Sequence, residues 1–108
     1  YKRQLQVSTP VEADKRYHTY NQYTIRVRSD GRDALMAHLD ACDIESRVYY
    51  PVPLHLLECF KYLGYRKGEF PVAEKAAAEV LALPIFPEMT SAQQDEVVEG
   101  VREYFRAE

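Results

Sequence analysis

Glycine and cysteine are scarce in this chain of 108 residues, and each scarcity excludes a class of site. The four glycines are scattered, so the sequence contains no glycine-rich loop that could cradle a phosphate group. The two cysteines, Cys42 and Cys59, are too few for a disulfide framework and lack the spacing of a zinc site. We expect both to be small residues of the core.

An excess of charge and a long apolar run are also missing. The net charge of -3 is spread along the chain, which argues against binding to nucleic acid or to an anionic membrane. No apolar run approaches the ~20 residues that span a bilayer, and no secretory leader opens the chain. We therefore expect a cytoplasmic protein. Because the chain begins at Tyr1 rather than at methionine, we also expect a piece of a longer protein.

Hydrophobic periodicity predicts strands at two places. Alternating apolar and polar residues predict a half-buried strand over residues 20–28, and residues 44–50 are expected to form a second strand that ends at Pro51. Leu5 and Val7 could begin a further short strand, although residues 1–17 are interpreted mainly as a connector. Residues 83–87 contain two prolines and are at best a short edge strand.

Helical spacing predicts four helices, over residues 31–41, 54–63 and 72–82 and after residue 90. Asp30 is expected to cap the first helix, Pro71 suits the first turn of the third, and Thr90 with Gln93 forms a capping box for the last. The order of the elements predicts an α+β domain in which a small sheet is backed by helices on one face.

Two segments carry the side chains best suited to ligand contact. Residues 17–23 bring His18 and Asn21 together with three tyrosines, although these tyrosines could equally cover one face of a sheet. In residues 47–55, Tyr49 and Tyr50 precede a stiff double-proline loop and His55. Such loops hold side chains in place at low entropic cost, but this one could also be a sharp reversal under aromatic rings.

The sequence lacks other catalytic motifs. His18, His38 and His55 lack metal-ligand spacing, and His38 is expected to be a solvated surface residue. No serine or cysteine stands in a nucleophile motif, and the acidic residues are not paired. The residues alone therefore predict a globular α+β domain and no enzyme.

The two segments nevertheless resemble the DegT/DnrJ/EryC1/StrS family of sugar aminotransferases. The resemblance covers nearly the whole chain beyond about residue 15 and is carried by His18-Thr19-Tyr20-Asn21-Gln22-Tyr23-Thr24-Ile25-Arg26-Val27, Val48-Tyr49-Tyr50-Pro51-Val52-Pro53-Leu54-His55-Leu56, Phe60-Lys61-Tyr62-Leu63-Gly64-Tyr65, Phe70-Pro71-Val72-Ala73-Glu74 and Leu83-Pro84-Ile85-Phe86-Pro87-Glu88-Met89-Thr90. It implies that residues 18–108 are the C-terminal small domain, with the small, mainly antiparallel sheet of the aspartate aminotransferase fold. It also implies that residues 1–17 connect to a larger domain.

The resemblance implies a homodimeric enzyme that uses pyridoxal phosphate. Such an enzyme moves an amino group from an amino acid such as glutamate onto a nucleotide-linked keto sugar, and its cofactor forms a Schiff base with a lysine of the large domain. None of the five lysines here stands in that lysine's context, so we expect this chain alone neither to bind the cofactor nor to catalyse the reaction.

The resemblance leaves substrate recognition to this domain. It places the tyrosine–proline loop near the active site across the dimer interface, so Tyr49, Tyr50 and His55 are the first candidates for substrate binding. His18 and Asn21 are second candidates near the domain junction. Tyr49 stands where many members have histidine, so a contact made by that imidazole is not carried over. Tyrosine pairs at this point look most like those of members that act on N-acetylated amino sugars linked to uridine diphosphate.

One alternative belongs to another class, a stand-alone ligand- or RNA-binding or regulatory module. The first predicted strand could form a platform for bases with Tyr23, Ile25, Arg26 and Arg28. The acidic net charge counts against this alternative.

Overall fold

A computed structural model describes residues 6–28 and 30–106 of the chain. It confirms the predicted α+β class, with an antiparallel sheet and helices packed on it. In chain order, the elements are β1 (Val7–Ser8), β2 (Tyr23–Val27), α1 (Arg32–Ala41), the 3-10 helices η2 (Leu54–Leu56) and η3 (Glu58–Leu63), α2 (Pro71–Glu79), β3 (Val80–Leu83) and α3 (Ser91–Arg106).

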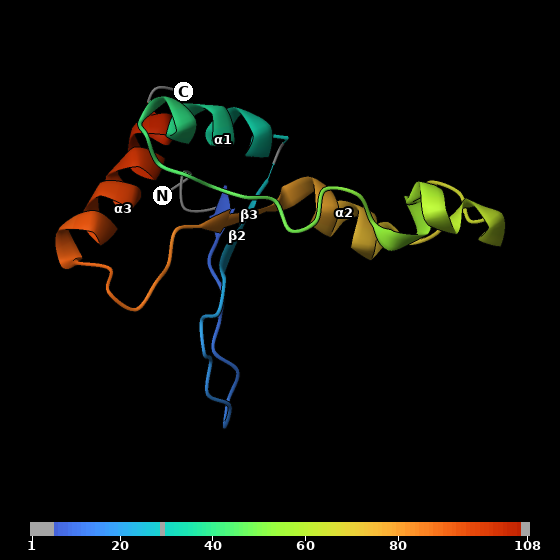
Figure 1. The fold of residues 1–108 in the computed structure, drawn as a ribbon, viewed down its shortest axis with the longest axis horizontal. Helices are drawn as coiled ribbons and strands as arrows, with labels where there is room; N and C mark the ends of the chain where they lie inside the picture. The colour runs from blue at the N-terminus through green and yellow to red at the C-terminus, as the bar shows by residue number, and fades with distance from the viewer. Residues whose placement is uncertain (1–5, 29, 107–108) are drawn as a thin grey trace.

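The sheet has three strands in the order β1-β2-β3, and both pairings are antiparallel. The central strand β2 is the one that the alternating sequence pattern predicted most clearly. Its register places Ile25 opposite Leu81 of β3 and Val27 opposite Val7 of β1. The loop of residues 9–22, between β1 and β2, extends away from the sheet (Figure 1).

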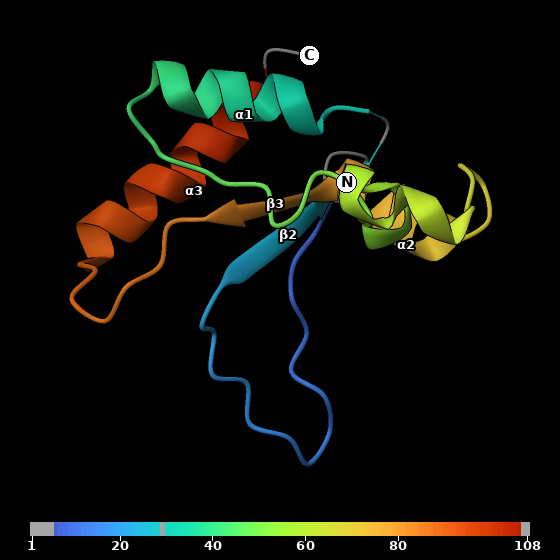
Figure 2. The same cartoon turned by 45° about the vertical axis from the view of Figure 1, so that its right-hand side comes forward.

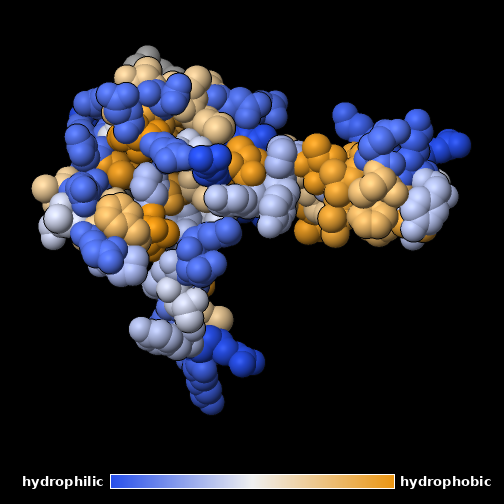
Figure 3. Space-filling view, in the orientation of Figure 1, coloured by the Kyte–Doolittle hydropathy of each residue, from blue (hydrophilic) through white to orange (hydrophobic). Residues whose placement is uncertain are grey.

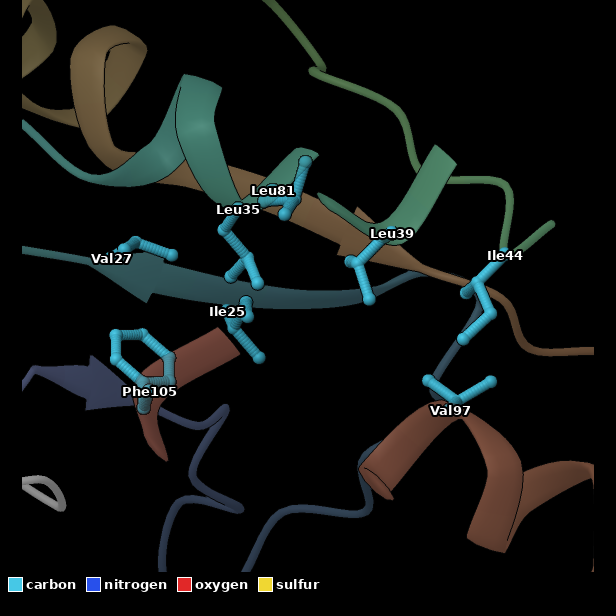
Figure 4. Packing of buried hydrophobic residues seen from close by; sticks show 8 residues of the cluster. All are labelled: Ile25, Val27, Leu35, Leu39, Ile44, Leu81, Val97 and Phe105. Carbon is cyan, nitrogen blue, oxygen red and sulfur yellow. The ribbon is translucent and has the colours of Figure 1, made fainter. Parts of the chain in front are cut away.

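The core lies between the sheet and the helices α1 and α3. The eight side chains of this cluster point toward one another from β2, β3, α1, α3 and the loop after α1 (Figure 4). Fully burying one such aliphatic side chain contributes about 2 kcal/mol. The cluster consists of Ile25, Val27, Leu35, Leu39, Ile44, Leu81, Val97 and Phe105.

An arm formed by η2, η3 and α2 extends from one side of this core (Figures 1 and 2). Hydrophobic side chains gather along the arm and are visible from outside (Figure 3). Isolated domains rarely expose so many neighbouring apolar residues, so the arm has the composition of a contact surface. The exposed apolar residues of the arm and the loop before it are Tyr49, Tyr50, Val52, Leu54, Tyr62, Leu63, Tyr65, Phe70 and Val72.

The predicted strand over residues 44–50 is wrong. Only Arg47 pairs with the sheet, in an isolated bridge to Ala82. The start of the segment is held elsewhere, because the Ile44 backbone N–H donates to Leu39 O at the end of α1 and the Ile44 side chain enters the core. Core packing therefore overrides the strand propensity of this segment.

The predicted helix over residues 72–82 is too long, because α2 ends at Glu79 and Val80–Leu83 form β3. Leu81 is fully buried in the core. Its burial favours a strand here and outweighs the helix propensity of the alanine-rich run. The edge strand thus lies before the prolines of residues 83–87 rather than among them. A buried guanidinium also marks the end of α2, since Arg32 donates to Ala77 O at 2.9 Å and to Val80 O at 3.0 Å.

Three smaller predictions also need correction. The helix expected over residues 54–63 is two 3-10 helices separated by extended backbone at Leu57. Gly31, not Asp30, is the N-cap of α1, because Asp30 has a φ of 56°. Cys42 and Cys59 are exposed rather than buried in the core.

The start of the chain is only partly within the described ranges. Leu5 lies outside them, whereas Val7 does begin a short strand. The predicted capping box of α3 is confirmed, because Gln93 N–H donates to Thr90 Oγ1 and Thr90 N–H donates to Gln93 Oε1. Within the part of the chain that the structure describes, no helix has both the length and the apolar character for a membrane crossing.

Candidate ligand-binding site around Tyr49

Tyr49 lies where the chain leaves the edge of the sheet. Two backbone hydrogen bonds fix this departure point, from Arg47 N–H to Ala82 O at 3.0 Å and from Ala82 N–H to Arg47 O at 2.7 Å. Tyr49 comes two residues later, is 42% exposed, and lines two separate grooves. Its phenol is therefore a hydrogen-bonding group on a well-anchored segment.

The first groove, here called the polar groove, has a volume of about 370 Å³. It brings together amide, guanidinium, carboxylate and phenol groups with apolar side chains. Such a mixture suits a ligand that has hydroxyl or phosphate groups together with an apolar face. The groove is lined by Asn21, Gln22, Glu45, Arg47, Tyr49, Ala82, Leu83, Pro84, Ile85 and Phe86.

Arg47 is the cation of the polar groove, and sequence reasoning did not select it. Its guanidinium forms an ion pair with Glu45, and its side chain remains 65% exposed. A guanidinium in this position can bind a phosphate with two parallel hydrogen bonds. The usable signal in the sequence was a cation two residues before the tyrosine pair.

The second groove, here called the apolar groove, has a volume of about 620 Å³ and runs between the double-proline loop and α2. Tyr50, which is 75% exposed, lies beside it, and its ring meets the Tyr49 ring edge-on at 5.9 Å. The lining is Tyr49, Tyr50, Pro51, Val52, Pro53, Leu54, Leu57, Ala73, Ala76, Ala77 and Val80. This groove offers an apolar surface rather than a set of hydrogen-bonding groups.

His55 points into the arm. Its side chain is only 7% exposed, and its ring meets the Phe70 ring edge-on at 4.8 Å. Its Nε2 lies 3.4 Å from Glu74 Oε2, although this atom has no hydrogen-bond partner of good geometry among the described residues. In this structure His55 therefore contacts the arm, and its part in substrate binding stays a prediction.

Glu74 organises the loop that covers His55. Its carboxylate accepts backbone N–H groups from Gly68, at 2.7 and 2.9 Å, and from Phe70, at 3.2 Å. The Gly68 hydrogen bond holds the pKa of Glu74 below its usual value, and the Phe70 hydrogen bond and nearby His55 act in the same direction against the effect of desolvation. Gly68 itself has a φ of 97°, a backbone conformation that residues with a side chain rarely adopt.

The two candidates of the N-terminal loop differ in position. Asn21 lines the polar groove together with Tyr49, so the structure brings these two predicted residues together. His18 instead stacks on Tyr20 at 4.0 Å, and its Nδ1 accepts the Tyr20 backbone N–H at 2.9 Å. His18 is not among the residues that line either groove.

The described residues do not fit a site for pyridoxal phosphate on their own. Holding this cofactor covalently requires a lysine whose amine faces an enclosed site. The lysines within residues 6–28 and 30–106 are all exposed, and none lines the polar or apolar groove. These lysines are Lys15, Lys61, Lys67 and Lys75.

Known proteins with similar sequences point to one family. The sequence profile of the DegT/DnrJ/EryC1/StrS aminotransferase family matches residues 1–102. A pleiotropic regulatory protein of Geobacillus stearothermophilus is 52% identical over 100 residues, which are 93% of this chain and 26% of that protein. A dTDP-3-amino-3,4,6-trideoxy-alpha-D-glucose transaminase of Micromonospora megalomicea subsp. nigra is 38% identical over 95 residues, which are 87% of this chain and 25% of that protein.

Solved structures agree with these relatives. The crystal structure of S. venezuelae DesV in complex with a ketimine intermediate superposes with a TM-score of 0.87 and 35% identity, over 93% of this chain and 26% of that one. NtdA from Bacillus subtilis, solved with bound cofactor PMP, superposes with a TM-score of 0.78 and 26% identity, over 97% of this chain and 24% of that one. The chain thus spans about a quarter of the length of its relatives.

Proposed function

Because this chain belongs to the DegT/DnrJ/EryC1/StrS aminotransferase family, we propose that it is the C-terminal small domain of a nucleotide-sugar aminotransferase. The whole enzyme transfers an amino group from an amino acid such as glutamate to a nucleotide-linked keto sugar. Residues 18–108 contribute substrate recognition and dimer contacts, and residues 1–17 lead in from the larger domain. Val7 and Ser8 of this connector pair with β2, so this part of the connector is attached to the sheet.

The polar groove carries this proposal. Arg47 supplies a positive charge for the diphosphate of the nucleotide, and Asn21 and Tyr49 supply hydrogen bonds for sugar hydroxyl groups. The exposed ring of Phe86, which also lines the groove, provides an apolar face for the sugar or base. The tyrosine–proline loop is stiff and anchored at Arg47, so Arg47 and Tyr49 are positioned before the ligand arrives.

The proposed larger domain holds the cofactor. Pyridoxal phosphate supplies an electron sink for amino transfer when it is bound there. The residues of this chain bind and orient the substrate beside it, and the exposed apolar arm contacts either the larger domain or the second subunit. The relatives support this division, because each of them is about four times as long as the matched segment.

The test uses the full-length protein that contains this chain, supplied with pyridoxal phosphate and glutamate. We expect an absorbance band of bound cofactor, and amino transfer to dTDP- or UDP-linked keto sugars detected by mass spectrometry of the product. This chain alone should show neither. A full-length protein that stays colourless and inactive would contradict the proposal.

One specific observation favours a second candidate, a regulatory function. The Geobacillus relative with 52% identity is named for regulation rather than for transamination. A regulator could use the same polar groove to sense a sugar nucleotide without converting it. Binding of the nucleotide sugar by a full-length protein that takes up no cofactor would support this candidate over the enzyme.

The RNA-platform alternative has little support in the structure. Ile25, in the middle of the proposed platform strand, is buried in the core. The guanidinium of Arg26 binds Glu79 at 2.9 Å, and that of Arg28 reaches Ser8 Oγ at 3.4 Å. These side chains therefore do not form an open surface for stacked bases.

A further inference from the structure

We propose that α1 and α3 together form a binding site for a zinc ion, on a part of the molecule separate from the polar groove. The site consists of His38 and Cys42 at the end of α1 and Glu103 on α3. One potential ligand atom from each of these residues lies within 4.8 Å of the other two. The three residues stem from two helices that pack against each other, so the chain fold rather than sequence proximity brings Glu103 to the pair.

The separation of the two helix residues suits a common metal ion. His38 and Cys42 are one helical turn apart and share a face, and their Nε2 and Sγ atoms are 3.8 Å apart. Two ligands of a tetrahedral zinc ion, with Zn–N and Zn–S bonds of about 2.0 and 2.3 Å, stand roughly 3.5 Å apart. Closing this small difference needs only a side-chain adjustment.

The ligand types also favour zinc over harder cations. Imidazole, thiolate and carboxylate form the mixed donor set typical of zinc, whereas calcium and magnesium prefer oxygen ligands alone. Three protein ligands leave a fourth position for water. The exposed carboxylate of Glu103 has no ion-pair partner among the described residues, so binding a metal would break no existing bridge.

The surroundings favour a positive ion at this position. The negative end of the α1 dipole lies here, since Cys42 is the C-cap of the helix and its N–H bonds to His38 O and Leu39 O. The ring of Tyr104 packs against His38 at 5.7 Å and restricts the orientation of the imidazole. His38 is consequently half-buried, not the fully solvated residue that the sequence predicted.

The competing explanation is a thiol–imidazole hydrogen bond without any metal. The distance of 3.8 Å between Cys42 Sγ and His38 Nε2 is compatible with such a bond. That pair would make no use of Glu103, so replacing Glu103 would change nothing that the thiol and imidazole do. The two explanations therefore differ in what a titration with the metal would show.

The experiment is a calorimetric titration of the full-length protein with Zn²⁺, repeated for Cys42→Ser, Glu103→Gln and His38→Ala. We expect one zinc equivalent that each substitution weakens by at least tenfold, since even loss of an outer-shell partner weakens a metal site by about 10–100-fold. The matched controls are Cys59→Ser, at the other exposed cysteine, and Glu96→Gln, at an exposed acid on α3, the helix that carries Glu103. Both controls should bind zinc as the wild type does.

Co²⁺ provides an independent readout that needs no enzyme activity. Its difference spectrum should show thiolate-to-metal charge transfer in the wild type and in Cys59→Ser, and none in Cys42→Ser. Cys42 and Glu103 are exposed, so their substitutions leave the core intact, which circular dichroism checks. Zinc binding that is absent, or unchanged in Cys42→Ser and Glu103→Gln, would overturn the proposal and leave only the hydrogen bond.

Discussion

Glu74 is the residue whose charge state has the clearest structural consequence. Its carboxylate holds the loop before α2 through the N–H groups of Gly68 and Phe70, and these bonds favour its ionised form. Because its pKa is lower in the folded state than in the unfolded state, its contribution to stability is present above the ordinary glutamate value of 4.5. That contribution is lost as the pH falls through the lowered folded-state pKa.

This gives a prediction for hydrogen exchange. In the wild type, the protection factors of residues 65–70 should stay constant above about pH 4.5 and fall at lower pH. In Glu74→Gln, protection should be lower at neutral pH and nearly independent of pH, because the amide carries no titrating charge. Exchange measured by mass spectrometry checks both. Identical pH profiles for the two proteins would show that the carboxylate does not hold this loop.

At the scale of single residues, the sequence predicted some of the residues that line the polar groove but not the environment of each candidate. Tyr49 and Asn21 do line one groove, as two members of the predicted set. His55 lies inside the arm beside Glu74. This position depends on the conformation of the loop of residues 64–70, which hydrophobic periodicity does not predict. Arg47 was missed because a cation within a predicted strand is usually an ordinary surface residue.

Arg32 connects the arm to the core at the scale of elements. Its buried guanidinium donates from the start of α1 to Ala77 O and Val80 O, where α2 ends and β3 begins. Arg32→Met keeps most of the side-chain volume but leaves these carbonyls without their charged donor. We expect the free energy of unfolding to fall by about 2 kcal/mol, from hydrogen bonds to a charged group.

Urea denaturation measures this loss as a lower midpoint at an unchanged slope. The matched control is Arg102→Met, which removes an exposed guanidinium from α3 and should change stability by less than about 0.5 kcal/mol. Equal effects of the two substitutions would contradict the assigned role of Arg32.

Gly100 sets the distance between α3 and the elements that pack on it. A Cβ atom at this position would lie 2.7 Å from Ile44 Cδ1 and 3.2 Å from Leu39 Cδ2. Gly100→Leu should therefore overpack the core and lower the free energy of unfolding by about 2 kcal/mol, despite the better helix propensity of leucine. Ala92→Leu on the exposed face of α3 is the control, and thermal unfolding should show a loss only for Gly100→Leu.

Elements were predictable where local and tertiary preferences agree. The alternating strand β2 and the capped helix α3 followed from their sequence patterns. The prediction was wrong at residues 44–50 and 80–82, where the side chains of Ile44 and Leu81 are buried in the core. The alanine-rich run before residue 80 favours a helix. Burial of Leu81 and the hydrogen bond from Arg32 to Val80 O favour a strand at its end.

At the scale of the whole molecule, the chain spans about a quarter of the length of its relatives. The exposed apolar arm and the open polar groove are both features that a partner surface or a ligand would complete. The α+β class was predictable from the order of elements. What packs on the arm was not, because the sequence pattern does not show what contacts the exposed apolar residues there.

The central claim is that the polar groove binds the nucleotide sugar, and one measurement tests it most directly. Steady-state kinetics of the full-length enzyme should give KM values for the nucleotide sugar about tenfold higher or more for Arg47→Gln and several-fold higher for Tyr49→Phe. The larger increase reflects the loss of a hydrogen bond from the charged Arg47, and the smaller one the loss of a hydrogen bond from the neutral Tyr49 hydroxyl. The value of kcat should change little. Tyr62→Phe, in an exposed tyrosine outside the groove, should leave KM unchanged. Wild-type KM values for both Arg47→Gln and Tyr49→Phe would contradict the account.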